Sequence, residues 1–355
     1  MRGVNPFIGE EGGQENALQF HSLNAGKMDL TLDLTVPEAR DVVFDLVRWC
    51  DVLTESFSPK AMANWGFGYE KLKEINPELI MFSSCLMGQT GPMKQYAGFG
   101  TMAAAIAGFY PVTGWPDRIP AGPFTAYTDY ISPRLSVPVI LAALEHRERT
   151  GHGQRIDFAQ LEGALHFLSP QLLDEEINGR TAERAGNADA HMAPHAVYPA
   201  AGSDRWVAIA CETDEQWMAL ARTIGAERLM ELSVEERRER VDELDALISS
   251  WTAAREPLQA QEELQAAAIP SHMVNDAYDL VADPQMQHRR HFQEVPHPIH
   301  GETWVESGNY TMSRTPSRID WGGPMFGQHN MEVLEGLLGY DGDRIAELVI
   351  AGAIA

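Results

Sequence analysis

The order of hydrophobic and polar residues in the first part of the chain predicts strands that alternate with helices. Residues 29–34 alternate strictly between polar and apolar side chains, which is the pattern of a strand. Residues 36–50 predict a helix, because valine and leucine recur there at helical spacing. Residues 51–55 predict a short strand, and the continuous apolar run at residues 79–85 is typical of a fully buried strand. This order indicates an α/β fold with a parallel sheet, in which ligands bind beyond the carboxyl ends of the strands.

A long apolar helix is predicted from Ser132 onward. A serine oxygen can cap a free N–H group and proline fits the first turn, so Ser132 and Pro133 form a typical helix start. Pro138 lies inside the apolar run, which leaves a kink or a later start open. A short strand at residues 154–158 and one long amphipathic helix at residues 161–177 are predicted to follow.

A change of composition at residues 178–194 predicts a linker between two domains, because glycine, alanine, asparagine and aspartate replace the apolar period there. A hairpin, three helices and a strand are predicted beyond it. We therefore expect a large domain that starts with residues 1–190, a small α+β domain at residues 191–298, and a return to the large domain at residues 299–355.

Composition narrows the possible partners. The 355 residues carry a net charge of −24, whereas nucleic acids and anionic membranes bind basic surfaces, so we expect neither as a partner. A small anionic ligand needs only a few local cations and stays possible. The three cysteines are far apart, which predicts neither a disulfide framework nor a thiolate metal site and favours a reducing, cytoplasmic location. No signal peptide or membrane span is predicted.

Carboxylates near strand ends are the chemical groups that the motif search leaves. The chain has no phosphate loop, no G-x-S-x-G elbow and no C-x-x-C pair, and Pro194 rules out helical zinc binding by His191 and His195. Asp129 lies just ahead of the predicted helix start, where the helix dipole favours a negative charge. A carboxylate there could attack an activated acyl group in a dry pocket. A simple capping or turn aspartate is the alternative.

A series of segments in one order carries a family resemblance. The segments are Asn24–Lys27 with Leu30–Leu34, Asp51–Pro59, Trp65–Tyr69, Asn76–Ile80, Gly88–Pro92, Leu141–Gln154 and Ser313–Pro316. Together they resemble the class III CoA-transferases of the CaiB/BaiF type, which include formyl-CoA transferase and the carnitine and bile-acid CoA-transferases. Counting back from the Leu141 segment places the family's nucleophilic aspartate at Asp129.

The resemblance implies an acyl-CoA:carboxylate CoA-transferase whose aspartate forms a mixed anhydride and then an aspartyl-CoA thioester. Acyl-CoA and a carboxylic acid are the implied partners, coenzyme A is carried as a substrate, and no permanently bound cofactor or metal is implied. The implied fold is an interlocked homodimer of rings with a Rossmann-like large domain, and a heteromer with a related subunit is the alternative. The implied CoA-binding residues are Asn24, Ala25, Gly26, Lys27, Ser56, Phe57, Ser58, Cys85, Leu86, Met87 and Gly88.

Three departures from the family pattern bear on this expectation. Family members usually open with a strand-helix-strand unit ahead of the first residue here, so a non-catalytic CoA-binding subunit is an alternative. Ile131-Ser132-Pro133 follows the aspartate where the family has a small residue and glycine, and Asn64 stands at a position that is often basic.

Two further expectations concern the substrate. The related alpha-methylacyl-CoA racemases carry a Gly-His-Asp motif that matches Gly98-Phe99-Gly100 here, so both acid/base residues are missing and transferase is favoured over racemase. Arg118 and Arg134 are candidates to bind a substrate carboxylate, with ordinary surface arginines as the alternative.

Overall fold

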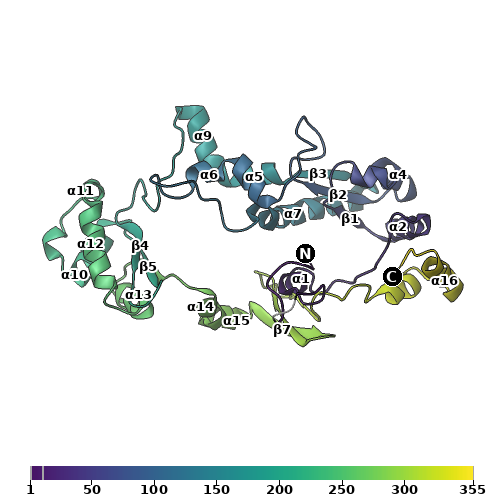
Figure 1. The fold of residues 1–355 in the computed structure, drawn as a ribbon. Coiled ribbons are helices and arrows are strands. Elements are labelled where there is room, and N and C mark those ends of the chain that lie inside the picture. Colours follow the sequence, from purple (N-terminus) through teal and green to yellow (C-terminus); the bar gives the residue numbers. More distant parts are fainter. Residues whose placement is uncertain (1, 10–11, 355) are drawn as a thin grey trace. The chain divides into compact units, whose positions relative to one another are not determined.

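A computed structural model describes residues 2–9 and 12–354 of the chain (Figure 1). The chain divides into two compact units. One comprises Met1–Gly100, Thr128–Ala164 and Leu280–Ala355, and the other comprises Thr101–Tyr127 and Leu165–Asp279. The predicted domain boundaries near residues 190 and 298 stay a prediction.

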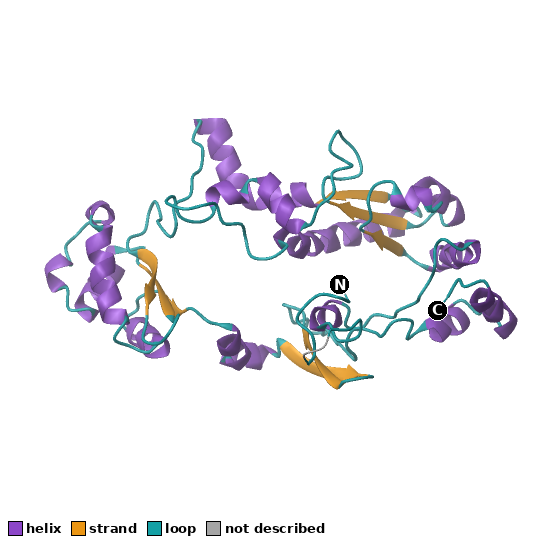
Figure 2. Ribbon diagram, viewed as in Figure 1, coloured by secondary structure: helices purple, strands orange, loops and turns teal. Residues whose placement is uncertain are grey.

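The first unit contains the predicted parallel sheet. Strands β1 (Val52–Glu55), β2 (Ile80–Cys85) and β3 (Arg155–Ala159) pair in the order β1-β2-β3, and both pairings are parallel. Figure 2 shows these three orange strands side by side. Because β2 is central, its first four residues are fully buried, as its continuous apolar run predicted. The carboxyl ends of all three strands meet at one edge of the sheet.

Helices precede β1 and lie between it and β2. Helix α2 (Pro37–Trp49) starts with a proline in its first turn and buries Ala39, Val42 and Val47. Helices α3 (Ala61–Asn64) and α4 (Tyr69–Ile75) lie between β1 and β2. Val47, Phe67, Leu72, Leu79 and Met81 form the buried cluster of this part.

Helix α7 (Tyr127–Thr150) follows α5 (Gly100–Ala107) and α6 (Phe109–Val112). The predicted start of this helix was wrong. It begins at Tyr127 rather than Ser132 and runs through Pro133 and Pro138. Hydroxyl groups bond the carbonyls of the turns around these prolines: Ser132 Oγ donates to Thr128 O at 2.6 Å, and Ser136 Oγ donates to Pro133 O at 2.9 Å. The carbonyls that lose a helical donor to the two prolines are those of Asp129 and Arg134, so these hydroxyl contacts satisfy the side chains of Ser132 and Ser136 and do not replace the missing bonds.

The predicted strand at residues 29–34 is wrong. This segment pairs with no strand among residues 2–9 and 12–354, and its backbone bonds the side chains of His329 and Asn330 instead. The backbone N–H of Asp29 donates to His329 Nδ1 at 3.1 Å, and that of Thr31 donates to Asn330 Oδ1 at 2.9 Å. Leu30 and Leu32 pack against the core between α2 and α16 (Gly342–Ile350), whereas Leu34 packs against the cluster around Val47 and Phe67. The alternation therefore reflects burial on one side without sheet pairing.

The single helix predicted at residues 161–177 is also wrong, because three helical segments lie there. They are α8 (Gln160–Leu165), the 3-10 turn η1 (His166–Leu168) and α9 (Ser169–Asn178). Pro170 lies in the first turn of α9. Proline has no N–H group to continue a preceding helix, so it favours a new helix start at this point.

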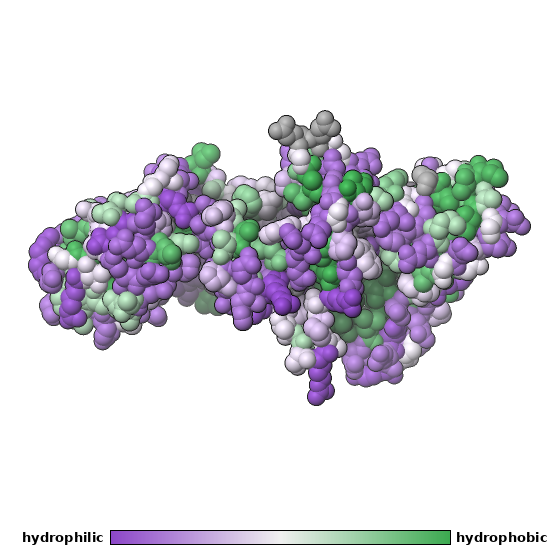
Figure 3. All heavy atoms as spheres, turned by 90° about the horizontal axis from the view of Figure 1, so that it is seen from below, coloured by the Kyte–Doolittle hydropathy of each residue, from purple (hydrophilic) through white to green (hydrophobic). Residues whose placement is uncertain are grey.

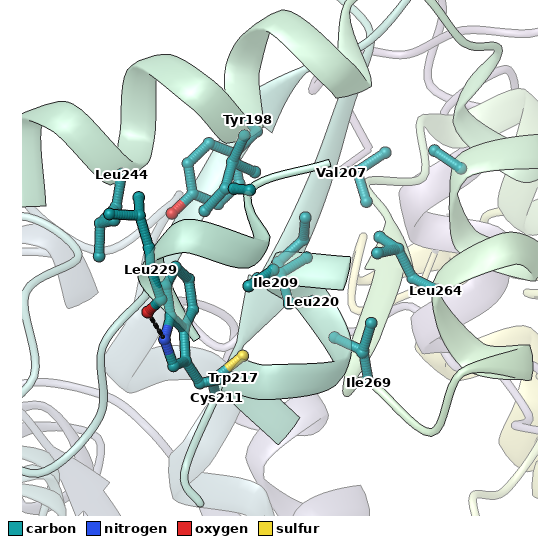
Figure 4. Packing of buried hydrophobic residues seen from close by; sticks show 14 of the residues in the cluster. Tyr198, Val207, Ile209, Cys211, Trp217, Leu220, Leu229, Leu244, Leu264 and Ile269 are labelled. Carbon is teal, nitrogen blue, oxygen red and sulfur yellow. Dashed lines mark hydrogen bonds between the residues drawn. The ribbon is translucent and has the colours of Figure 1, made fainter. Parts of the chain in front are cut away.

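The second unit is built on an antiparallel sheet. Strands β4 (His195–Pro199), β5 (Trp206–Ala210) and β6 (Ser271–Met273) pair in that order, which confirms the predicted hairpin. Around this sheet the unit contains helices α10 (Asp214–Thr223), α11 (Val234–Glu239), α12 (Val241–Thr252) and α13 (Pro257–Ala266) and the 3-10 turn η2 (Glu227–Leu229). The core centres on Trp217, whose Nε1–H donates to Leu229 O at 2.8 Å (Figure 4).

The C-terminal part of the first unit contains a second small sheet. Helices α14 (Ala277–Ala282) and α15 (Pro284–Arg289) lead to the antiparallel pair β7 (Phe292–His297) and β8 (Gly301–Glu306), and the π-helix η3 (Glu332–Leu337) precedes α16. Helix α1 (Leu18–Leu23) brings His21 against this hairpin, with its ring centroid 4.2 Å from that of His297.

The surface seen in Figure 3 is mixed in hydropathy. Figure 3 shows hydrophilic residues over much of one face, with hydrophobic residues in separate groups. No helix in residues 2–9 and 12–354 combines the length and the apolar character needed to cross a bilayer.

Candidate active site

A cavity of about 720 Å³ lies in the first unit at the carboxyl ends of β1 and β2. This volume is typical of a small-molecule site. Three kinds of segment line it: the strand ends with the loops that follow them, the loop ahead of α5, and the first turns of α7. The lining residues are Thr54–Pro59, Phe82, Ser84–Leu86, Lys94–Phe99, Asp129, Ser132, Pro133, Ser136 and Gln160.

Asp129 is half-buried in the first turn of α7, where the sequence analysis had placed it just ahead of a helix. The backbone N–H of Gly100 donates to Asp129 Oδ2 at 3.1 Å, and Thr128 Oγ1 donates back to Gly100 O at 3.2 Å. The helix dipole favours a carboxylate at this end. Among the described residues none hydrogen-bonds Oδ1, so one oxygen orients the carboxylate and the other is available to react.

The loop after β1 forms one wall of the cavity. The Glu55 carboxylate accepts the backbone N–H of Phe57 at 2.8 Å, which holds the turn that carries Ser56 and Ser58. The Phe57 ring packs edge-on against Trp65, with centroids 5.0 Å apart. The loop thus presents an aromatic ring and two hydroxyl side chains at the cavity.

The loop after β2 is fastened at two points. The backbone N–H of Gln89 donates to Asp157 Oδ1 at 2.7 Å, and that of Leu161 donates to Leu86 O at 3.0 Å. Gly88 adopts φ +81°, and a Cβ there would lie 3.4 Å from Asp157 Oδ1, so a side chain would strain this turn. Cys85 and Leu86 line the cavity, whereas Met87 and Gly88 shape the turn without lining it.

Cys85 is the thiol of this lining, which also contains serine and threonine hydroxyl groups. Burial raises the pKa of its thiol, and the negative charge of Asp157 raises it further. A thiol with a raised pKa stays protonated near neutral pH and is a poor nucleophile. The electrostatics therefore favour a carboxylate over Cys85 as the attacking group.

Several predicted site residues do not line this cavity. The segment Asn24–Lys27 packs on Trp321, whose indole N–H donates to Lys27 O at 3.2 Å. Arg118 lies in the second unit and pairs with its neighbour Asp117, with Nε and Oδ1 3.1 Å apart. Arg134 is exposed on α7 and its guanidinium bonds the Tyr130 carbonyl. Their roles in binding stay predictions.

The residues that the sequence analysis missed are mainly Lys94–Phe99, with Ser136 and Gln160. Only the position of residues 94–99 in the chain could have indicated that they line the site. They follow the carboxyl end of β2 and precede Gly100 in a glycine-containing loop. Gly98 and Phe99 also lie in the match to the racemase motif, whereas Lys94–Ala97 belong to no motif. Among the described residues, no group of three or more His, Cys, Asp or Glu side chains has the arrangement of a metal site.

Known proteins match this chain along most of its length. The family model for CoA-transferase family III matches residues 1–330. The succinyl-CoA–D-citramalate CoA-transferase of Chloroflexus aurantiacus is 33% identical over 330 residues, which cover 92% of this chain and 82% of that protein. The succinyl-CoA–L-malate CoA-transferase beta subunit of the same organism is 31% identical over 340 residues, with 94% and 84% covered.

A solved structure agrees with the sequence matches. The crystal structure of a CaiB/BaiF family protein from Brucella suis superimposes with a TM-score of 0.85 at 30% identity, covering 94% of this chain and 87% of that one. The parallel sheet and its helices thus follow a known fold. The chain belongs to CoA-transferase family III and is a CoA-transferase.

Proposed function

We propose that the chain transfers CoA from an acyl-CoA to a carboxylic acid through a covalent intermediate on Asp129. The observation that carries this proposal is the position of Asp129. Its carboxylate lines the cavity at the strand ends, with Oδ2 held by the Gly100 N–H and Oδ1 without a partner among the described residues. A nucleophile oriented in this way matches the needs of covalent acyl transfer.

The proposed reaction has two symmetric halves. Asp129 attacks the thioester carbonyl of the donor, the C–S bond breaks, and CoA thiolate leaves behind an acyl-aspartyl anhydride. The thiolate then attacks the aspartyl carbonyl, which releases the donor acid as a carboxylate and forms an aspartyl-CoA thioester. An acceptor carboxylate attacks that thioester and expels the thiolate, which finally takes the acceptor acyl group and regenerates Asp129. Each half consumes one carboxylate and releases one, so no net proton transfer is needed.

The names of the relatives support a substrate class. They are named for succinyl-CoA, D-citramalate and L-malate, which are all dicarboxylic in their acid forms. We propose dicarboxylic acids as substrates of this chain. The loops after β1 and β2 are the proposed contacts for the pantetheine arm, because they flank Asp129 in the cavity.

The cavity supports transfer over racemisation. Among the described residues that line it there is no histidine, and Gly100 uses its backbone N–H on Asp129 where racemases resembling this family carry an acid/base pair. Removal of an α-proton needs such a pair. Uptake of deuterium at the α-carbon of a 2-methylacyl-CoA tests this alternative, and its appearance at a turnover rate would favour a racemase.

The covalent step has a direct test. The protein is incubated with succinyl-CoA, quenched with hydroxylamine and digested, and the peptide that contains Asp129 is weighed by mass spectrometry. The proposal expects a hydroxamate on Asp129 in wild type and none in Asp129→Asn. An unmodified Asp129 during measurable turnover would overturn the mechanism.

Assembly is proposed from the same resemblance. We propose an interlocked homodimer, with a heteromer as the alternative because one relative is named as a beta subunit. Light scattering of the purified chain separates these cases: the mass of two identical chains supports the first, and a monomer that gains activity only with a second related chain supports the alternative.

A further inference from the structure

The loop at residues 94–99 brings a positive charge into the cavity. Among the described residues, Lys94 is the only lysine or arginine of the lining, and the acidic residues there are Glu55 and Asp129. The Lys94 ammonium has no hydrogen bond or ion pair with any described residue, whereas Glu55 is held by the Phe57 N–H. A cation without a partner among the described residues, in the same cavity as Asp129, is available to an anionic ligand.

Two turns hold this loop. The Lys94 N–H approaches Gly91 O at 3.4 Å, and the Tyr96 N–H donates to Met93 O at 2.8 Å. The loop then continues directly into Gly100, whose N–H orients Asp129. One continuous segment therefore carries both the group that orients the nucleophile and the cation.

The same segment supplies an apolar surface. Tyr96 and Phe99 line the cavity and are 39% and 81% exposed. A dicarboxylic acyl chain has an apolar methylene spacer between its reacting carbonyl and its distal carboxylate. Aromatic faces suit the spacer, and an ammonium suits the carboxylate.

We infer that Lys94 binds the distal carboxylate of the acyl group and so makes the enzyme selective for dicarboxylic over monocarboxylic substrates. This inference rests on the proposed function, since it takes Asp129 as the point of attack. The CoA phosphates are the competing anions, but the pantetheine arm separates them from the thioester carbonyl. A cation in the same cavity as Asp129 is better placed for the acyl end.

The test compares two donors of equal chain length, succinyl-CoA and butyryl-CoA, which differ in the distal carboxylate. For Lys94→Met we expect kcat/KM with succinyl-CoA to fall roughly 10- to 100-fold, the usual effect of losing a charge-assisted hydrogen bond. With butyryl-CoA the change should stay within about twofold, because that donor makes no such bond. Lys94→Arg should restore much of the preference.

The matched control is Lys73→Met, which removes the same charge from the exposed side of α4, outside the cavity lining. Lys73→Met should leave kcat/KM unchanged with both donors. An equal loss with both donors in Lys94→Met would assign Lys94 to the CoA phosphates and overturn the inference, as would a wild type without preference for succinyl-CoA.

Hydroxylamine trapping keeps the two proposals apart. If both donors label Asp129 in Lys94→Met and the preference for succinyl-CoA over butyryl-CoA is the same as in wild type, the inference about Lys94 is wrong and the covalent mechanism stands. If Lys94→Met loses the preference for succinyl-CoA but neither donor ever labels Asp129, the role of Lys94 is supported and the covalent mechanism is wrong.

Discussion

The cavity around Asp129 and the core of the second unit use similar residues for opposite purposes. In the second unit Trp217 is fully buried, and its indole N–H is paired with the Leu229 carbonyl. In the cavity, Phe57 and Phe99 are 48% and 81% exposed. Buried aromatics contribute stability through the area removed from water, whereas exposed aromatics leave that free energy for a ligand.

The helices of the two regions differ in the same way. Helices α10 and α11 begin with complete capping boxes at Thr213 and Ser233. Helix α7 instead contains two prolines and buries hydroxyl groups at Ser132 and Ser136. The second unit follows rules that stabilise helices, and α7 departs from them near the candidate nucleophile Asp129. This contrast is common, because sites that bind and react are less optimised for stability than cores.

The largest expected effect is the loss of activity in Asp129→Asn. We expect kcat to fall at least about 1,000-fold, because the amide is a far weaker nucleophile than the carboxylate. Steady-state transfer from succinyl-CoA measures it. Glu55→Gln is the comparison, since it changes the other carboxylate of the lining. An equal loss of kcat in both variants would contradict the assignment of Asp129, and not Glu55, as the nucleophile.

Trp217→Ala should lower the free energy of unfolding by about 3–5 kcal/mol, the usual cost of truncating a buried large aromatic. Urea denaturation followed by circular dichroism measures it. The same aromatic-to-alanine change at Phe99 should alter stability by only about 0.5 kcal/mol, as is typical of exposed positions. Similar losses at both positions would show that Phe99 is part of a core.

A smaller effect is expected from pH at the histidine cluster of the first unit. Burial, together with repulsion from the nearby His21 and His300 rings, lowers the pKa of His297 to about 4, while Glu15 opposes this shift. Unfolded histidine binds a proton near its ordinary pKa, so acid favours the unfolded state. Stability from His297 is present above pH 6.5 and is lost as pH falls toward 4, by roughly 2 kcal/mol.

Urea unfolding at a series of pH values tests this expectation. His297→Gln removes the titrating ring, so its unfolding free energy should fall less steeply between pH 6.5 and 4. A steeper fall in the variant than in wild type would contradict the assignment. The cavity lining contains no histidine among the described residues, so residues of the site itself do not produce this effect.

The smallest expected effect concerns Asp157, which acts through the loop after β2. Asp157→Ala removes the acceptor for the Gln89 N–H and should raise the KM for succinyl-CoA about tenfold with little change in kcat. Asp157→Asn keeps an oxygen acceptor and should restore most of the affinity. Arg155→Ala on the same strand is the control. A loss of thermal stability with unchanged KM would show that Asp157 only supports the fold.

The sequence predicted the parallel sheet well and the irregular segments poorly. The apolar run at β2 identifies a buried central strand without knowledge of its neighbours, because burial on both faces leaves no polar positions. The strand predicted from the alternation at residues 29–34 was wrong. The leucines of this segment are partly buried on one side, as in a strand, but its backbone bonds the side chains of His329 and Asn330 and not another strand. The periodicity of apolar residues indicates which side of a segment is buried. Whether that segment pairs as a strand depends on the segment that lies next to it in the fold.

The candidate site was predicted in part. The loops at Ser56–Ser58 and Cys85–Leu86 follow strands that the pattern identifies, and the structure brings both to one cavity with Asp129. The cation at Lys94 was not predicted, since no motif marks a lysine in an irregular loop. Its place depends on the turns at Gly91 and Met93 and on the junction with Gly100.

The sequence by itself determined the α/β class, the parallel order of the strands and, through family resemblance, Asp129 as the candidate nucleophile. These features depend on local periodicity and on residue identity, which one chain carries in full. The tertiary structure decided that α7 begins before Asp129, that the Gly100 N–H orients its carboxylate, and that Lys94 joins it in one cavity. Those features depend on contacts between segments distant in the chain, which local patterns do not encode.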